Sequence, residues 1–148
     1  MMATPQQAST QKKQRKQLRP QKEDAAKFAQ LSAAFVNEND LEAAEGAAEF
    51  AVAADKASFD AWLMLGVCRA RKKNYEPAVP CYVKALELRP DDVAAWCDLG
   101  ELFTLMMDYD RAAAALRQAM TLDPNADHPS GRRARAIVGR TLAMLKKK

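Results

Sequence analysis

Residues 59–92, FDAWLMLGVCRARKKNYEPAVPCYVKALELRPDD, are followed directly by residues 93–126, VAAWCDLGELFTLMMDYDRAAAALRQAMTLDPNA, and together they decide the fold because one repeats the pattern of the other. Eight positions match at one constant offset, which equals the length of either segment: Trp62 and Trp96, Leu65 and Leu99, Gly66 and Gly100, Tyr75 and Tyr109, Ala78 and Ala112, Ala85 and Ala119, Leu88 and Leu122, and Pro90 and Pro124. A fixed period of this length indicates an array of repeated structural units.

Each repeat predicts two antiparallel helices, each with one packing face. In the first half of residues 59–92, Trp62 and Gly66 follow the i, i+4 spacing of a helix face. In the second half, Ala78 and Ala85 occupy the packing face, and their small side chains allow the two helices to approach closely. The proline at the end of each repeat closes the second helix, since proline cannot donate the helical hydrogen bond. We therefore expect an all-α fold.

The residues W-x2-L-G, followed by Tyr, Ala, Ala and Pro at these spacings, resemble the tetratricopeptide repeat. This resemblance implies a right-handed α-solenoid of about three helix pairs with a C-terminal capping helix. Moving the frame back by one repeat gives a weaker copy over residues 25–58, in which Ser32 replaces the glycine and Lys56 replaces the closing proline. Because terminal repeats are often atypical, residues 25–58 are predicted to be a degenerate first repeat.

Charge and composition divide the chain into a tail and a repeat domain. Residues 1–22 carry six basic and no acidic residues, and they have too few apolar side chains to offset the entropy lost on ordering. We expect them to be a disordered basic tail. Residues 23–148 are predicted to be the repeat domain, in which the apolar stripe of a last helix, residues 130–146, caps the repeat at residues 93–126.

The sequence contains no recognisable catalytic or metal-binding motif. The cysteines Cys68, Cys81 and Cys97 form no CxxC pair, and His128, the single histidine, precedes a proline and is expected to be an exposed linker residue. An odd number of thiols in helical, apolar surroundings fits a reducing compartment, with Cys68 and Cys81 in packing roles. No stretch approaches the roughly 18 apolar residues of a membrane helix. We expect a soluble, cytoplasmic, non-catalytic protein without cofactor or metal.

The resemblance to tetratricopeptide repeats also implies a binding surface, because the first helix of each pair lines the concave face in that family. Carried onto this chain, the predicted peptide-binding positions are Gln30, Ala33, Asn37, Asp60, Leu63, Met64, Val67, Arg71, Cys97, Asp98, Glu101 and Leu105. Only Arg71 and Asn37 resemble the basic and amide residues with which relatives hold a carboxylate. Leu63, Met64, Val67 and Leu105 could form pockets and favour an extended, largely apolar peptide, although Leu and Met at helical spacing are equally compatible with core packing.

Within the second repeat, the sequence from residue 65 to residue 92 resembles the translocator chaperones of bacterial type III secretion, on Leu65, Gly66, Cys68, Arg69, Tyr75, Ala78, Tyr82 and Ala85. This second resemblance implies a small cytoplasmic chaperone that binds an extended segment of a secreted translocator protein and forms a homodimer through residues 25–58. Two prolines depart from the pattern. Pro77 and Pro80 both fall near the start of a second helix, where we expect them to shorten or distort the first turn.

Two other functions remain open at this point. One is a general scaffold that assembles a protein complex through the convex face or the capping helix. The other is a nucleic-acid or ribosome-associated protein that acts through the two basic ends of the chain. No aromatic residues are interleaved with the basic residues of the N-terminal tail for base stacking, which disfavours the nucleic-acid function.

Overall fold

The structure is a computed structural model that describes residues 4–9 and 19–147. Its described elements are a short helical turn at residues 5–9, η1 (Lys22–Asp24), α2 (Ala25–Asn37), α3 (Leu41–Ala54), α4 (Phe59–Arg71), α5 (Tyr75–Leu88), α6 (Val93–Leu105), α7 (Tyr109–Leu122) and α8 (Pro129–Lys146). No strand occurs in these two stretches. None of the helices in them is long and apolar enough to span a membrane.

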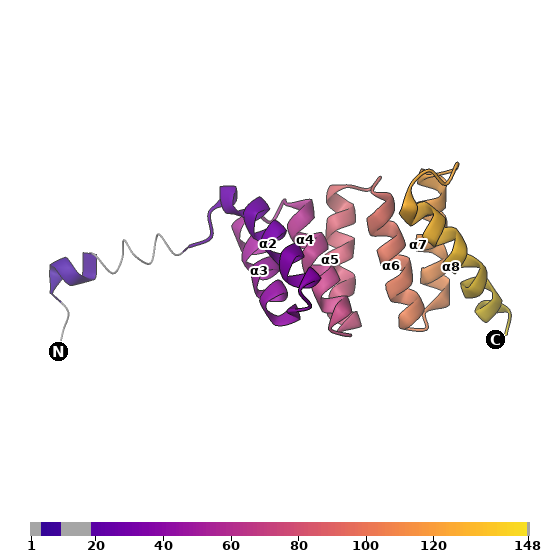
Figure 1. Ribbon diagram of the computed structural model, residues 1–148, viewed down its shortest axis with the longest axis horizontal. Coiled ribbons are helices and arrows are strands. Elements are labelled where there is room, and N and C mark those ends of the chain that lie inside the picture. Colours follow the sequence, from indigo (N-terminus) through magenta and orange to yellow (C-terminus); the bar gives the residue numbers. More distant parts are fainter. Residues whose placement is uncertain (1–3, 10–18, 148) are drawn as a thin grey trace.

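The helices stack in sequence order as antiparallel pairs (Figure 1). α2 packs on α3, α4 on α5 and α6 on α7, and each pair contacts the next through α3 with α4 and α5 with α6. α8 packs against both α6 and α7 and closes the end of the array. The predicted all-α solenoid of three helix pairs with a capping helix is therefore confirmed.

The turn within each pair has the same backbone conformation in all three repeats. Asn39, Lys73 and Met107 each have a positive φ, between 60° and 64°, although none is glycine. They occupy equivalent positions in the three repeats, and the residue after each one donates a backbone hydrogen bond of 2.9 Å to the carbonyl oxygen five positions earlier. Such a left-handed residue satisfies carbonyl groups at the end of the first helix. The turn at Asn39 thus identifies residues 25–58 as a structural equivalent of the other two repeats.

Buried alanines hold the paired helices together at equivalent positions. Ala44, Ala78 and Ala112 have no exposed surface, and the same is true of Ala51, Ala85 and Ala119 further along the same helices. Because an alanine methyl group is small, helix backbones can approach closely at these points. The degenerate first repeat therefore keeps the small residues on which the pairing depends.

Ser32 replaces the glycine of the other repeats. It can be buried because its hydroxyl group donates a hydrogen bond to a backbone carbonyl oxygen. The Ser32 Oγ donates a hydrogen bond of 2.7 Å to the Ala44 carbonyl oxygen and lies 3.4 Å from the Cys68 Sγ. A buried hydroxyl group with a partner avoids most of the desolvation penalty. Lys56 stands at the position of the closing proline, and its backbone carbonyl oxygen accepts a hydrogen bond of 2.8 Å from the Trp62 indole N–H. The carbonyl oxygen of Pro90 accepts the same bond from the equivalent Trp96.

The glycines of the other two repeats are sites of close helix approach. A Cβ atom added at Gly66 would lie 3.1 Å from the Tyr82 ring, and one at Gly100 would lie 2.6 Å from Leu116. Leu116 is completely buried, so it has little room to move away. A side chain at Gly100 would therefore force α6 away from α7.

Side-chain caps begin most of these helices, but not α5. Asp40, Ser58, Asp92 and Asp108 each accept a hydrogen bond from the backbone N–H three residues later. Asn74 precedes α5 with the same type of backbone geometry but makes no such bond. The residue three positions after Asn74 is a proline, which has no N–H to donate. The expected cap at this turn is therefore absent for a local chemical reason.

The prolines do not shorten α5, which corrects the expectation from the sequence. α5 has 14 residues, as does the equivalent α7. Pro77 lies in the first turn, where N–H groups have no partner within the helix, so it removes no helical hydrogen bond. Pro80 lies further inside and removes one bond, while the surrounding contacts of α5 with α4 and α6 maintain the helix.

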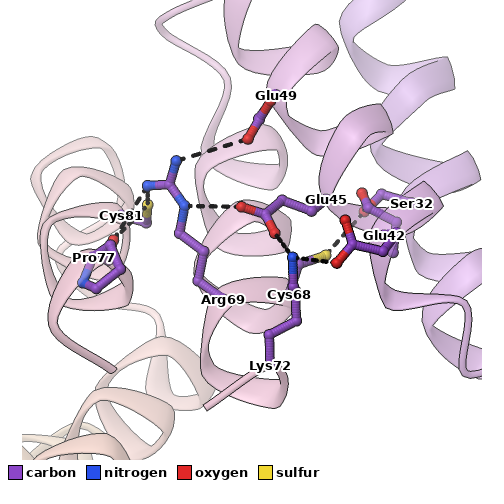
Figure 2. Close-up of polar contacts among 10 residues, drawn as sticks. Ser32, Glu42, Glu45, Glu49, Cys68, Arg69, Lys72, Pro77 and Cys81 are labelled. Atoms are coloured by element: carbon purple, nitrogen blue, oxygen red, sulfur yellow. Dashed lines mark hydrogen bonds and ion pairs between the residues drawn. The ribbon is translucent and has the colours of Figure 1, made fainter. Parts of the chain in front are cut away.

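A charged network joins the first repeat to the second (Figure 2). Lys72 on α4 contacts Glu42 and Glu45 on α3 at 2.7 and 2.8 Å, and Arg69 lies 3.5 Å from Glu45. The hydrogen bond from Lys72 lowers the pKa of the Glu45 carboxyl group below its usual range, although partial burial opposes this shift. On its other side, the Arg69 guanidinium group donates to the Pro77 carbonyl oxygen of α5 at 3.2 Å. Arg69 thus bridges three consecutive helices.

The predicted basic tail lies mostly outside the described residues, since the structure does not describe residues 1–3 and 10–18. Residues 5–9 are helical and exposed. At the other end, α8 begins one residue earlier than the predicted capping helix. His128 is exposed as expected, but it also has a structural role, because its Nδ1 accepts a hydrogen bond of 3.0 Å from the Ser130 backbone N–H and caps α8.

Candidate functional site

Five of the twelve predicted binding residues meet in a pocket of about 410 Å³ between α4 and α6. α4 contributes Val67 and Arg71, and α6 contributes Asp98, Glu101 and Leu105. They meet because both helices are the first of their pairs and turn the same face toward one side of the array. The remaining lining residues are Ala70, Tyr82, Leu102 and Arg133. Tyr82 is almost completely buried, and this burial raises the pKa of its phenol group, so it remains neutral.

A charged cluster lies at the α6 wall of this pocket. Arg133 from α8 contacts Asp98 and pairs with Glu101, with its Nε 3.0 Å from the Glu101 Oε1. Burial raises the pKa of Asp98 to about 6, Arg133 opposes this shift, and the neighbouring Glu101 adds to it. Asp98 and Glu101 were predicted to face a peptide, whereas here both carboxylates have a partner within the chain.

A second pocket of about 500 Å³ adjoins the first between α6 and α8. Glu101 and Leu105 line both pockets, so the two lie next to each other along a surface formed by α4, α6 and α8. The other residues around the second pocket are Thr104, Tyr109, Ile137, Arg140, Thr141 and Met144. We refer to the two pockets together as the inner groove.

The three predicted residues on α2 lie apart from the inner groove. Gln30 and Asn37 are exposed and Ala33 is half-buried, and none of them lines either pocket. Asp60 lines a different hollow, of about 400 Å³, near the beginnings of α2 and α4. The α2 positions therefore contribute exposed surface to the array but no part of the groove.

Three other predicted residues are placed mainly in the packing of the array. Leu63 packs against the core around Phe59 and Tyr82, and Met64 packs against the first repeat. Both keep part of their surface exposed. Cys97 differs from the prediction, because its side chain is completely buried among residues of α7 and α8 and presents no surface to a ligand. The helix α8, which had no counterpart in the two complete sequence repeats, covers it.

Sequence reasoning missed the contribution of α8 to the groove. Arg133, Ile137, Arg140 and Met144 lie three or four residues apart and so share one helix face. This spacing indicates a second, partly charged face on α8 in addition to the apolar stripe that predicts a cap. The structure shows that its groove-facing side also supplies two arginines and a methionine.

The arginines at the start of α8 mainly hold the cap in place. Arg135 donates to the carbonyl oxygens of Asp123 and Pro124 at 2.8 and 2.9 Å, and Arg132 donates to those of Ala126 and Asp127. These carbonyl groups follow the end of α7. The basic C-terminal segment is therefore partly engaged in contacts within the chain, which weakens the case for a nucleic-acid surface.

The buried thiols are packing groups. Cys68, Cys81 and Cys97 are at most 1% exposed, and burial raises the pKa of each thiol above its usual value. A nucleophilic cysteine requires the opposite shift. Among residues 4–9 and 19–147, no group of three histidine, cysteine or acidic side chains is arranged to hold a metal ion. The expected packing roles of Cys68 and Cys81 agree with their positions.

Comparison with known families agrees with this arrangement of helix pairs. Residues 59–92 match a model of the tetratricopeptide repeat, and a second such model matches residues 81–114. The chain contains tetratricopeptide repeats. The first match coincides with α4 and α5, while the second extends from within α5 into α7. Tetratricopeptide repeats stack into solenoids with extended concave surfaces, which typically bind proteins.

A curated relative is the superkiller protein 3 of the yeast Schizosaccharomyces pombe, 36% identical over 61 residues. This match covers 41% of the present chain and only 4% of the length of the yeast protein. The relationship thus concerns a short stretch of a much longer protein.

Solved structures share the fold over most of the chain. The Yersinia enterocolitica type III secretion chaperone SycD, in complex with a peptide of the translocator YopD, aligns with a TM-score of 0.71 at 20% identity, over 83% of this chain and 94% of that one. The first tetratricopeptide domain of Spaghetti (RPAP3), bound to an HSP90 peptide, aligns with a TM-score of 0.78 at 13% identity, over 87% and 98%. The predicted resemblance to secretion chaperones is supported at the level of fold.

Proposed function

We propose that this chain binds an extended, largely apolar segment of a partner protein in the inner groove. The observation that carries the proposal is that the two pockets lie side by side, share Glu101 and Leu105, and together extend from α4 across α6 to α8. Val67 is half-buried and Leu105 is 58% exposed, so both have apolar surface that a ligand could cover. Covering it would be favourable by about 25 cal/mol for each Å² removed from water.

The similar structures provide support by analogy. SycD is seen with a peptide of its translocator, and Spaghetti is seen with an HSP90 peptide. Two proteins of this fold thus hold short segments of other proteins. For the present chain we propose the same type of ligand, without catalysis.

Among the possible biological roles, we favour that of a cytoplasmic chaperone for a type III secretion translocator. Support comes from the residues shared with that family in the second repeat and from the fold similarity to SycD. Such a chaperone would cover the apolar segments of its partner before export. In this role, residues 25–58 would provide the surface for a homodimer.

The groove is tested by placing a charge on its apolar wall. Random nine-residue peptides displayed on phage are selected on the full chain, and the enriched peptides are measured against Val67→Glu. We expect at least a tenfold loss of affinity, because the new carboxylate lies where an apolar side chain must be buried. Val83→Glu, on an exposed site of α5, is the matched control and should bind normally.

Helix content and thermal unfolding of both variants are compared by circular dichroism, so that loss of binding is separated from loss of fold. Full binding by a folded Val67→Glu variant would exclude the inner groove as the site. Co-expression with a translocator of a type III secretion system from the same organism tests the specific role. If the translocator does not copurify, the chaperone function is excluded while general peptide binding stands.

A further inference from the structure

The pocket between α6 and α8 combines an apolar lining with one cationic side chain at its edge. Leu105 is 58% and Met144 is 40% exposed, whereas Ile137 lines the pocket from α8 with only 7% of its surface exposed. Leu105 and Met144 therefore leave apolar surface that a ligand could cover. Arg140 lies on the same helix face, one turn before Met144.

Most polar side chains around this pocket already have partners. Thr104 donates to the Gly100 carbonyl oxygen at 2.9 Å, and Thr141 donates to the Ile137 carbonyl oxygen at 3.0 Å. Glu101 pairs with Arg133. These groups therefore offer little to a charged ligand.

Arg140 is different. Among residues 4–9 and 19–147, its guanidinium group has neither an ion pair nor a side-chain hydrogen bond, and the side chain is exposed. Arg71, in the α4 part of the groove, is also exposed, and its guanidinium group likewise has no ion pair or side-chain hydrogen bond within the described residues. The inner groove thus has three arginines and two carboxylates, and both carboxylates are engaged by Arg133. The charged side chains that remain to contact a ligand are therefore the cations Arg71, in the α4 part of the groove, and Arg140, in the α8 part.

On the basis of the proposed function, we propose that the bound segment places a large aliphatic side chain in the α6–α8 pocket and an adjacent carboxylate on Arg140. α8 is then a wall of the binding site as well as a cap. A guanidinium group holds a carboxylate through two parallel hydrogen bonds, and nearby apolar surface strengthens that interaction by excluding water. A lysine or arginine at the same point of the ligand would face Arg140 without a counterion.

The proposal is tested with the phage-displayed peptides selected on the full chain. We expect the enriched peptides to contain Leu, Ile or Met next to Asp or Glu. Synthetic versions should lose about tenfold in affinity when the acid is replaced by its amide, and the peptides with the acid intact should lose a similar amount on Arg140→Gln, as expected for a charge-assisted hydrogen bond. The two losses should not add, because they remove the same contact. Arg117→Gln, on an exposed site of α7 outside the groove, is the matched control.

The outcomes separate this proposal from the function on which it rests. Enriched peptides that depend on Val67 but are neutral or basic, or that bind Arg140→Gln unchanged, overturn the acidic-ligand proposal and leave peptide binding intact. Absence of any enriched peptide overturns both. Leu105→Glu should weaken peptide binding without altering the mass in sedimentation. If Leu105→Glu instead converts a dimer to a monomer and leaves peptide binding unchanged, the pocket is an interface between two copies, and the proposal is wrong.

Discussion

Arg133 on α8 pairs with Glu101 on α6, with the Nε and Oε1 atoms 3.0 Å apart, and the same guanidinium group contacts Asp98 one turn earlier. This cluster connects the capping helix to the third repeat at the wall of the inner groove. It places two carboxylates in a partly buried site with a single cation, so the balance of charge there depends on Arg133. The stability of the cap and the electrostatics of the groove are therefore linked.

Arg133→Gln is expected to destabilise the fold by about 1 kcal/mol, a modest value because the pair is partly exposed to water. The double variant Arg133→Gln with Asp98→Asn should recover part of this loss, since it removes one of the two unpaired carboxylates. Urea unfolding at neutral pH measures both, with Arg117→Gln as the control. Equal losses in the single and double variants would show that the repulsion between the carboxylates is unimportant.

The raised pKa of Asp98 predicts a pH dependence of stability. Its pKa of about 6 lies above the ordinary value of 3.8, so the folded state binds this proton more tightly than the unfolded chain. The resulting stabilisation is complete below the unfolded value and is lost as the pH rises through about 6. Asp98→Asn cannot titrate there. We therefore expect the variant to gain about 2 kcal/mol relative to the unchanged protein between about pH 4 and about pH 7.5.

Urea unfolding of both proteins across this pH range, at constant ionic strength, measures the difference. Groups that lie far from Asp98 titrate equally in the two proteins and cancel in the comparison. Parallel stability profiles would mean that Arg133 holds the Asp98 carboxyl group near its ordinary pKa, and the assignment of Asp98 as a destabilised anion would be wrong.

Gly100→Ala is expected to destabilise the protein by about 1–3 kcal/mol, because the new methyl group would meet the completely buried Leu116. The control is Gly139→Ala on α8, where a Cβ atom would meet nothing within 4 Å. That change should stabilise the protein by about 0.5–1 kcal/mol, since alanine favours a helix interior. Chemical unfolding distinguishes the two signs. A stabilised Gly100→Ala variant would contradict the close approach of α6 and α7.

Met107→Gly is expected to increase stability by up to about 1 kcal/mol. The φ of Met107 is 62°, a conformation that glycine adopts without strain, and the side chain is 72% exposed, so little packing is lost. Met106→Gly is the neighbouring control, because Met106 has a φ of −82° and packs against the core. It should lose stability. Thermal unfolding of the pair tests whether the left-handed turn stores strain.

The helical architecture was predictable because it depends on local and periodic information. The matched positions Trp62 and Trp96, and the alanines that recur with them, follow from the spacing of side chains along a helix. The length of α5 was not predictable from local sequence alone. The tolerance of α5 for Pro77 and Pro80 depends on where each missing N–H falls in the first turns and on packing by α4 and α6.

The lining of the proposed binding groove was only partly predictable. Val67, Arg71 and Leu105 were expected in the groove and lie there, but Cys97 is buried, and the residues of α2 contribute to neither pocket. The prediction treated each repeat as equivalent. In the structure, α8 adds a wall beside the third repeat that the first two do not have.

By itself, the sequence determined the repeat length, the pairing of helices and the small residues between them, because these follow from the spacing of side chains along each helix and from the constant offset between the repeats. Only the tertiary structure decided which charged groups meet. Arg133 and Glu101 are far apart along the chain, with the whole of α7 between them, and no periodic pattern relates them; packing of α8 on α6 brings them together. The same packing leaves Arg140 beside an open apolar pocket, because the partners of an ionic side chain depend on distance in space.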